Sequence, residues 1–231
     1  MSLKIYLLGQ FKLASNDLPL ELPSRPAQST LAFLALNPGA SLRREKLASL
    51  LWPEATEQNA RAYLRQALWR IRKAFDSASL NWEDFLHTDD ISVSFIDTTY
   101  CWLDAGALSA PQEGASADEL ISTVELYKGE LLPGFYDEWV LPERDRLQAA
   151  FHQKMNRLLE ALLLSNRSNE AILWSERWIQ HGQAPEPAFR TLMRAHAGLG
   201  DQAIVSAAYQ RCRQALQRDL GLDPSPETRR L

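Results

Sequence analysis

The sequence predicts a mainly α-helical protein built from two domains. We expect a winged helix-turn-helix of mixed α and β structure at residues 1–100 and an all-α, tetratricopeptide-like domain at residues 101–231. Three observations predict this arrangement: short alternating strands precede three closely spaced helices, an alternating hairpin pattern follows them, and the second half repeats with a period of about 34 residues. A length of 231 residues suits one or two domains.

The first 22 residues alternate as short strands do. Two apolar-rich runs, residues 3–8 and 11–14, come first, and the pair Asn16-Asp17 follows as a turn. In residues 18–22, leucine then occupies every second position. We therefore expect a small antiparallel sheet at the start of the chain.

Three helices follow, each with start or stop signals. The first is expected from Ser24, as its cap, to the breaking residues 37–39, and the second from Ser41 to Trp52-Pro53. A four-residue connection then leads to Thr56, which can cap the third helix. Two helices joined this tightly predict a helix-turn-helix, whose second helix enters a DNA groove.

The third helix, residues 56–75, separates apolar and polar side chains onto opposite faces. Its apolar stripe is predicted to be buried and comprises Ala60, Leu64, Ala67, Leu68, Ile71 and Phe75. The opposite sector holds Gln58, Ala62, Arg65, Gln66, Trp69 and Lys73, and further arginines flank it. Arginine, asparagine and glutamine can each make two hydrogen bonds to a base edge, so this face is typical of a DNA-reading helix.

Positive charge is concentrated around these helices although the whole chain has a net charge of −4. Residues 41–75 hold eight basic and three acidic side chains, a local net charge of +5. A phosphate-binding surface needs basic residues only where the duplex lies. The composition therefore does not exclude a nucleic-acid partner.

Several other classes of function find no support in the sequence. Its start lacks the apolar run of a signal peptide, and no stretch approaches the ~18 apolar residues of a membrane helix, so we expect a cytoplasmic protein with no membrane partner. Cys101 and Cys212 lack metal-ligand spacing, as do the four histidines, so we expect no metal and no cofactor. Phosphate-binding loops and nucleophile motifs are absent, and we find no catalytic constellation.

The rest of the chain divides into a hairpin, a junction and a helical region. Residues 85–95 alternate Ile91, Val93 and Phe95 with serines, which predicts a wing. Small polar residues at 97–117 predict the domain junction, and from residue 118 onward the sequence is typical of helix. Sliding the chain by 34 residues places similar side chains on one another, which predicts two helical hairpins with helices at 143–165, 168–181, 185–199 and 201–219.

Two stretches carry a family resemblance. They are LASLLWPEATEQNARAYLRQALWRIRKAF at 47–75 and LYKGELLPGFYDEWVLPERDRL at 126–147. Together they resemble the Streptomyces antibiotic regulatory protein (SARP) family, in which an OmpR-like winged helix-turn-helix precedes a bacterial transcriptional activation domain (BTAD). The resemblance extends over essentially the whole chain, from LLGQFKL near the start to LQRDLGLDPSPETRRL at the end.

The resemblance implies a bacterial, nucleoid-associated transcription activator with no enzyme activity. It would bind double-stranded promoter DNA at direct repeats, side by side, and contact RNA polymerase through its sigma subunit. The candidates for base contact are Gln58, Asn59, Ala62, Arg65, Gln66 and Trp69. The candidates for phosphate contact are Arg43, Arg44, Arg61, Arg70, Arg72 and Lys73.

Three features leave alternatives open. Relatives commonly carry a glycine-containing wing tip, whereas this chain has His87-Thr88-Asp89-Asp90, so His87 and Thr88 are only secondary candidates for DNA contact. Trp69 could stack on DNA or anchor the helical domain, and we prefer packing. For the aromatic cluster of Phe135, Tyr136 and Trp139 we prefer a core that locks the domain junction over a partner-binding surface.

Two other functions remain in competition with DNA binding. The helical domain could be a peptide- or ligand-sensing scaffold that uses the winged helix for docking, since tetratricopeptide grooves hold peptides. Alternatively, the chain could be the amino-terminal regulatory module of a longer signalling protein.

Overall fold

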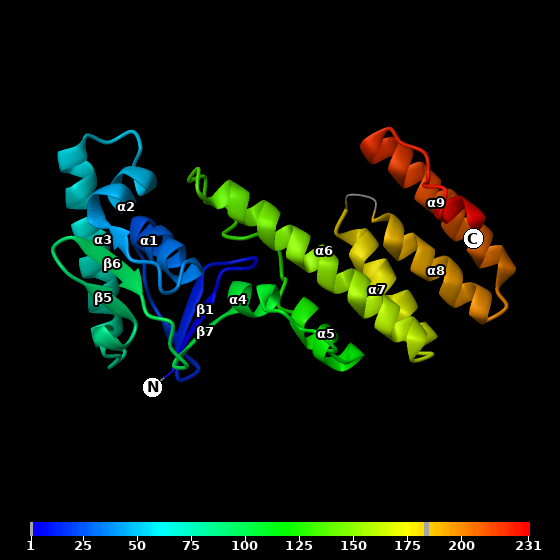
Figure 1. The fold of residues 1–231 in the computed structure, drawn as a ribbon, viewed down its shortest axis with the longest axis horizontal. Helices are drawn as coiled ribbons and strands as arrows, with labels where there is room; N and C mark the ends of the chain where they lie inside the picture. Colours follow the sequence, from blue (N-terminus) through cyan, green and yellow to red (C-terminus); the bar gives the residue numbers. More distant parts are fainter. Residues whose placement is uncertain (1, 183–184) are drawn as a thin grey trace. The chain divides into compact units, whose positions relative to one another are not determined.

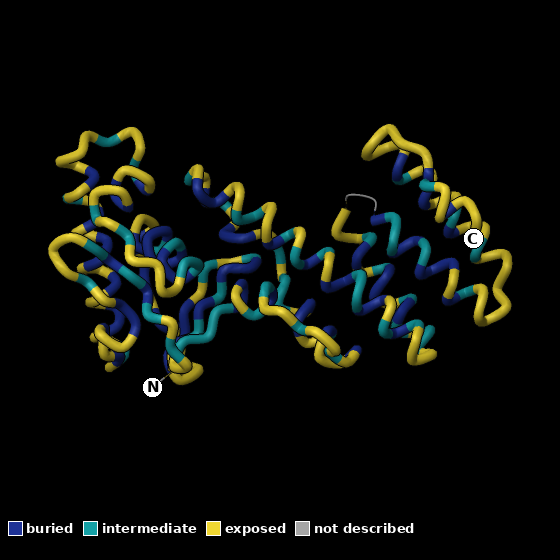
Figure 2. The backbone as a smooth tube through the Cα atoms, in the orientation of Figure 1, coloured by how far each residue is buried: buried dark blue, intermediate teal, exposed yellow. Residues whose placement is uncertain are grey.

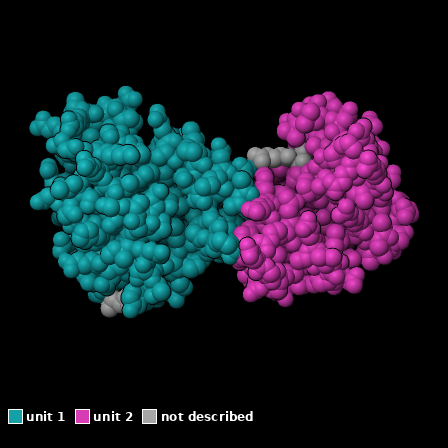
Figure 3. Space-filling view, viewed as in Figure 1, with its two compact units in different colours: residues 1–111, 125–150 teal, residues 112–124, 151–231 magenta. Residues whose placement is uncertain are grey.

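The computed structural model describes residues 2–182 and 185–231. Its fold is mostly helical, with mixed α and β structure near the amino terminus and helices toward the carboxyl terminus, which confirms the predicted fold class. The chain forms two compact units (Figure 3): unit 1 comprises residues 1–111 and 125–150, and unit 2 comprises residues 112–124 and 151–231. This division differs from a boundary at residue 100, because two later segments belong to unit 1.

Unit 1 contains the predicted antiparallel strands (Figure 1). They are β1 (Leu3–Tyr6), β2 (Lys12–Ser15) and β3 (Leu18–Leu20), and the turn residues Asn16 and Asp17 both have positive φ angles, 48° and 66°. Asparagine and aspartate tolerate this left-handed conformation better than most residues. A fourth strand, β7 (Cys101–Leu103), pairs parallel to β1. The sequence did not predict β7, which lies inside the expected junction.

The three helices of the winged helix-turn-helix are α1 (Arg25–Leu36), α2 (Arg44–Leu51) and α3 (Glu57–Ser77). The predicted start of the second helix at Ser41 is wrong, because residues 42–43 form a short strand, β4, that pairs with the wing. Thr56 caps α3 as expected, accepting a hydrogen bond from the Asn59 amide at 3.4 Å.

The apolar stripe of α3 forms part of the core of unit 1. All six predicted residues are buried, and Ala74 joins them. Phe75 is completely buried, with edge-on contact to Phe85 at a ring-centroid distance of 5.5 Å and a tilted contact to Trp82. Along α3, buried residues recur every three or four positions and exposed residues lie between them, as expected for a helix with one face in the core (Figure 2).

The wing follows a 3₁₀ turn, η1 (Trp82–Asp84). It consists of β5 (Leu86–Thr88) and β6 (Ser92–Phe95), which together with β4 form a sheet in the order β4-β6-β5. Val93 and Phe95 are buried as predicted. Ile91 is 70% exposed, so its predicted inward position is wrong, because it lies in the turn before β6.

Asp104 fastens the end of β1 to the start of helix α4 (Asp104–Ser109). Its side chain is buried and accepts hydrogen bonds from the backbone amides of Leu7 and Leu8 at 2.9–3.0 Å, and of Ala105 at 2.7 Å. Burial raises the pKa of this carboxyl above its ordinary value near 3.8, and the three amides oppose that shift. The carboxyl therefore binds its proton more tightly in the folded than in the unfolded chain.

This shift predicts a pH-dependent stability difference between the protein and its Asp104→Asn variant. A raised pKa in the folded state contributes stability that is fully present below the unfolded pKa near 3.8 and is lost as the pH rises through the folded value. The unfolding free energy of the wild type, minus that of the variant, should therefore increase as the pH falls from 7 to 4. Urea denaturation at several pH values would measure it, and a pH-independent difference would contradict the assignment.

Residues 125–139 correct the expectation that everything after residue 118 is helical. After α5 (Ala117–Val124), this segment is irregular and follows β1: the Gly9 amide donates to the Glu130 carbonyl at 2.9 Å, and the Leu132 amide donates to the Leu7 carbonyl at 2.9 Å. The backbone at residue 9 can lie this close to the backbone at residue 128 only because residue 9 is glycine. A Cβ on Gly9, which has a φ angle of 86°, would lie 2.9 Å from the Lys128 carbonyl carbon.

The aromatic cluster divides into buried and exposed members. Phe135 and Trp139 are buried; the Trp139 ring meets Phe33 of α1 edge-on at 5.1 Å, and its indole nitrogen donates to the Ser29 hydroxyl at 3.3 Å. The preferred core role is therefore confirmed for these two residues. It is wrong for Tyr136, which is 87% exposed.

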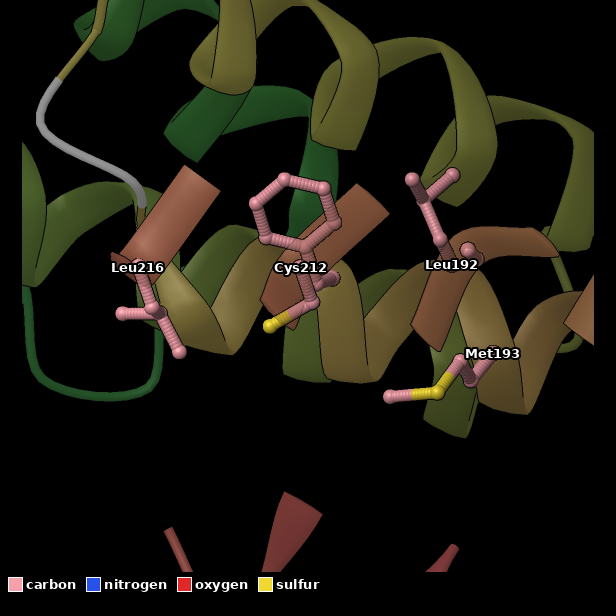
Figure 4. Close-up of a cluster of buried hydrophobic side chains, with 6 residues drawn as sticks. Leu192, Met193, Cys212 and Leu216 are labelled. Atoms are coloured by element: carbon pink, nitrogen blue, oxygen red, sulfur yellow. The ribbon is translucent and has the colours of Figure 1, made fainter. Parts of the chain in front are cut away.

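Unit 2 contains the predicted helical hairpins. Besides α5, its helices are the second part of α6 (Val140–Leu164), then α7 (Ser168–Gln180), α8 (Glu186–Gly198) and α9 (Gln202–Leu220), and a 3₁₀ turn, η2 (Thr228–Arg230), follows. Asn166 and Gly200, 34 positions apart, both have positive φ angles at helix ends. The core between α8 and α9 is apolar and includes Cys212 (Figure 4). Within the residues described, no helix is both long enough and apolar enough to cross a bilayer.

Candidate nucleic-acid interface

The polar face of α3 is open to solvent. Of the candidates for base contact, Gln58, Asn59, Arg65 and Gln66 are exposed, and Ala62 is half-buried. They occupy the amino-terminal two-thirds of a helix whose first turn is fixed by the Thr56 cap and whose opposite face is buried. The backbone that carries these side chains is therefore held rigidly, as recognition of a base edge requires.

Some cations of this region are free to bind an external anion, whereas others make contacts within the protein. Arg43, Arg65, Arg70 and Arg72 are exposed and have no acidic partner among the residues described. A guanidinium without a carboxylate partner keeps its full charge available to an external anion. The Lys73 ammonium lies 5.3 Å from the centre of the Trp69 ring, in cation–π contact.

Arg61 and Arg44 make contacts within the protein. Arg61 forms ion pairs with Glu45 of α2 at 2.7 Å and with Glu57 of its own helix, and so connects the two helices of the helix-turn-helix. Arg44 is half-buried and donates a hydrogen bond to the backbone carbonyl of Asp89 at 3.0 Å. Both arginines thus position α2 against its neighbours.

Trp69 does not pack into unit 1. It is 58% exposed, beside Lys73 and a shallow hollow formed with residues 21–24. The preferred role of Trp69, anchoring the helical domain, stays a prediction. Arg70 and Lys73 line the same hollow, so the exposed indole presents an apolar surface next to positive charge.

The acidic tip of the wing has a structural explanation. The Asp89 carboxylate accepts hydrogen bonds from the backbone amides of Ile91 at 2.7 Å and Ser92 at 2.6 Å, which lowers the pKa of Asp89. Its charge is thereby partly neutralised within the turn. His87 is exposed, 3.7 Å from this carboxylate, and Thr88 is half-buried in β5.

Sequence reasoning missed part of this surface. Tyr63 is 44% exposed, and its ring meets Trp52 edge-on at 5.9 Å. Together with Gln66 and Arg70 it lines one wall of a cavity whose other wall is residues 24–26. Helical spacing places Tyr63 beside the polar sector of α3. Residues 24–26, in contrast, lie some 40 positions away in the sequence, and only the tertiary fold brings them to α3.

The thiols and histidines provide no metal centre in the described part of the chain. Burial raises the pKa of Cys101 to about 12 and that of Cys212 to about 11. Both cysteines are therefore protonated at neutral pH and are poor nucleophiles.

Comparisons with known proteins agree with this architecture. A family described as "Bacterial transcriptional activator domain" matches residues 103–231, more than half of the chain. A search of curated proteins finds no match. Among solved structures, Mycobacterium tuberculosis EmbR, in complex with a low-affinity phosphopeptide, shares the fold with a TM-score of 0.83 at 22% identity. The alignment covers 99% of this chain and 63% of the EmbR chain.

The two findings complement one another. The family match begins at β7 and includes the GELLPGFYDEW segment and all the helical hairpins. The structural match extends over the winged helix-turn-helix as well, and together they confirm the resemblance that the sequence motifs indicated. The chain therefore belongs to the bacterial transcriptional activator domain family.

Proposed function

We propose that this protein is a transcription activator that binds promoter DNA sequence-specifically through α3. The observation that carries the proposal is the exposed face of α3, where amides and unpaired guanidinium groups stand side by side above a buried apolar stripe. Side chains of this type can form paired hydrogen bonds with guanine or adenine in the major groove. In this proposal Gln58, Asn59, Ala62, Arg65 and Gln66 read bases, and Arg43, Arg70, Arg72 and Lys73 hold phosphates.

The assignment of the remaining candidates follows from their contacts. Arg61 and Arg44 position α2, so we propose that they support DNA binding indirectly. Trp69 lies at the end of the reading face and would stack on a sugar or a thymine methyl. The wing, through His87 and Thr88, would contribute little, because a carboxylate lies at its tip.

The activating half of the function is also a proposal. Residues 101–231 would form the activation domain and recruit RNA polymerase through its sigma subunit, while two copies bind neighbouring direct repeats on the nucleoid. The family description supports a role in transcriptional activation. A reporter assay with a promoter carrying one or two repeats would test recruitment separately from DNA binding.

The base and phosphate roles predict different effects of mutation. Arg65→Ala and Gln66→Ala should each weaken binding to the promoter site by ~5- to 150-fold, the equivalent of ~1–3 kcal/mol, and barely change binding to scrambled DNA. Lys73→Ala should weaken both about equally and should reduce the slope of log K against log salt by about 1.

Fluorescence anisotropy with specific and scrambled duplexes at several salt concentrations would measure these effects. Arg213→Ala is the matched control, because Arg213 is exposed on α9 in the other unit. If wild-type protein bound no promoter fragment, the proposed function would be wrong.

A further inference from the structure

We propose that the cavity between the first turn of α1 and the side of α3 is a seat for one phosphate of the DNA backbone. The inference rests on the proposed DNA binding and adds a contact that the reading helix alone does not supply. The cavity has a volume of about 420 Å³. It is lined by Ser24, Arg25, Pro26, Trp52, Tyr63, Gln66, Ala67 and Arg70.

The charged side chains that line the cavity are both cations, whereas a separate cavity that Arg25 also lines contains Glu54, Asp137 and Glu138. Arg25 and Arg70 supply two guanidinium groups, no carboxylate lines the cavity, and the first turn of α1 contains no acidic residue. The amino end of a helix carries partial positive charge, so a cation such as Arg25 is unfavourable there on its own. An anion between Arg25, Arg70 and the helix end removes this repulsion.

Ser24 provides an independent indication of a ligand. It occupies the cap position of α1 and is only 8% exposed, yet its side chain makes no capping bond to the first turn. Its hydroxyl also has no other hydrogen-bond partner within the described residues. In contrast, Thr56 and Asn81 each accept a backbone amide at their own helix starts. The residue is mostly buried, and its hydroxyl lines the cavity without a partner among these residues, which suits an anion that bonds to this hydroxyl and to the amino end of α1.

The other wall connects the cavity to the proposed reading face. Tyr63 is oriented by its contact with Trp52, and Gln66 lies one turn further along α3. Gln66 and Arg70 also border the proposed reading face. A duplex that brings a base edge to Gln66 would therefore place a backbone phosphate next to the cavity. This continuity favours a DNA phosphate diester over a free phosphate ion as the occupant.

The sharpest test is Ser24→Asp in the full chain. Aspartate is a good helix cap, and its negative charge is stabilised at a helix amino end, so the variant should have a higher Tm than the wild type. The same carboxylate would fill the cavity with negative charge, and binding to both specific and scrambled DNA should fall about tenfold or more. A purely structural role of Ser24 predicts the same rise in Tm but an unchanged DNA affinity, which would overturn the proposal.

Arg25 gives a second, independent test. Arg25→Gln should lower the slope of log K against log salt by about 1, whereas Arg25→Lys, which keeps the charge, should largely preserve it. The lysine variant also controls for packing, because the Arg25 guanidinium lies 4.4 Å from the Phe135 ring centre. Arg213→Gln, in unit 2, should leave the slope unchanged.

Chemically modified duplexes identify the occupant. Replacing single phosphates with neutral methylphosphonates should reveal one position that weakens wild-type binding but causes no further loss in Ser24→Asp or Arg25→Gln. If these variants bound DNA with the affinity and salt dependence of the wild type, the proposed phosphate site would be wrong, but the proposed DNA binding through α3 would be unaffected. If the wild type did not bind DNA, both the proposed function and the proposed phosphate site would be wrong. Tight binding of inorganic phosphate, lost in Ser24→Asp while DNA affinity is retained, would assign the cavity to a free anion and overturn the DNA contact.

Discussion

Replacing Arg144 with alanine should lower the free energy of unfolding of unit 1 by about 3–5 kcal/mol, because this one side chain holds an irregular loop in place. The Arg144 guanidinium donates to the carbonyls of Leu131 at 2.8 Å, Leu132 at 2.7 Å and Phe135 at 2.9 Å, and its side chain is only 16% exposed. Loss of the guanidinium removes a donor from each of these three carbonyls, and the Leu132 carbonyl keeps only the Phe135 amide, at 3.0 Å. Hydrogen bonds from charged donors contribute ~1.5–3 kcal/mol each, and they are not fully additive here.

The loop that Arg144 holds has an unfavourable backbone of its own. Leu132 has a φ angle of 47°, which is strained for a leucine, and Gly134 has a φ angle of 78°. Without the guanidinium the loop would relax and withdraw Phe135 and Trp139 from α1. Arg144→Lys should recover only part of the stability, because an ammonium cannot reproduce the planar fork that reaches several carbonyls.

Arg146→Ala is the matched control. Arg146 lies on the same helix, is 47% exposed and bonds to Glu143 and Ser109, so its loss should cost at most about 1 kcal/mol. Urea denaturation followed by circular dichroism would compare the three variants with the wild type. Equal effects of Arg144→Ala and Arg146→Ala would show that the loop is held by its apolar side chains instead.

The parts of the fold that depend on local pattern could be predicted from the sequence. The stripe of α3, the Thr56 cap, the Asn16-Asp17 turn and the four hairpin helices all follow from side-chain spacing and turn chemistry within about one to four residues of their observed bounds. The 34-residue repeat was visible because equivalent core positions carry similar side chains.

The errors share a physical cause, which is contact between segments distant in the sequence. Residues 42–43 look like the start of a helix, but β6 draws them into a sheet. Cys101–Leu103 look like a linker, but β1 offers them a parallel partner. The GELLPGFYDEW segment contains helix-compatible residues, yet Arg144 and the end of β1 give its backbone other hydrogen-bond partners.

In the candidate site, too, local spacing could be predicted from the sequence and contacts between distant segments could not. Helical periodicity placed the exposed residues of α3 correctly on one face. It could not show that Glu45 binds Arg61 or that the Asp89 carbonyl binds Arg44. Nor could it show that the start of α1 and the side of α3 line one cavity. Each of these contacts joins two elements whose distance is set by tertiary packing.

A chain truncated after residue 100 should lose cooperative folding, although it contains the complete sequence pattern of a winged helix-turn-helix. It would lack β7, so that β1 loses its parallel partner, and Asp104, which satisfies the Leu7 and Leu8 amides. It would also lose buried apolar side chains of unit 1, among them Leu131, Leu132, Phe135, Trp139 and Val140.

Full burial of one large apolar side chain contributes ~1.5–3 kcal/mol, so five of them rival the ~5–15 kcal/mol by which a whole domain is usually stable. A chain ending after residue 164, which keeps all of unit 1 and all of α6, is the matched comparison. Thermal melts should show a cooperative transition for the longer chain and none for the shorter. Cooperative melting of residues 1–100 would place the domain boundary at residue 100 after all. A broad, non-cooperative melt would mean that the first part of the activator-family region belongs structurally to the same unit as the winged helix-turn-helix, so that a change at residues 125–150 affects α1 and the proposed phosphate site beside it directly.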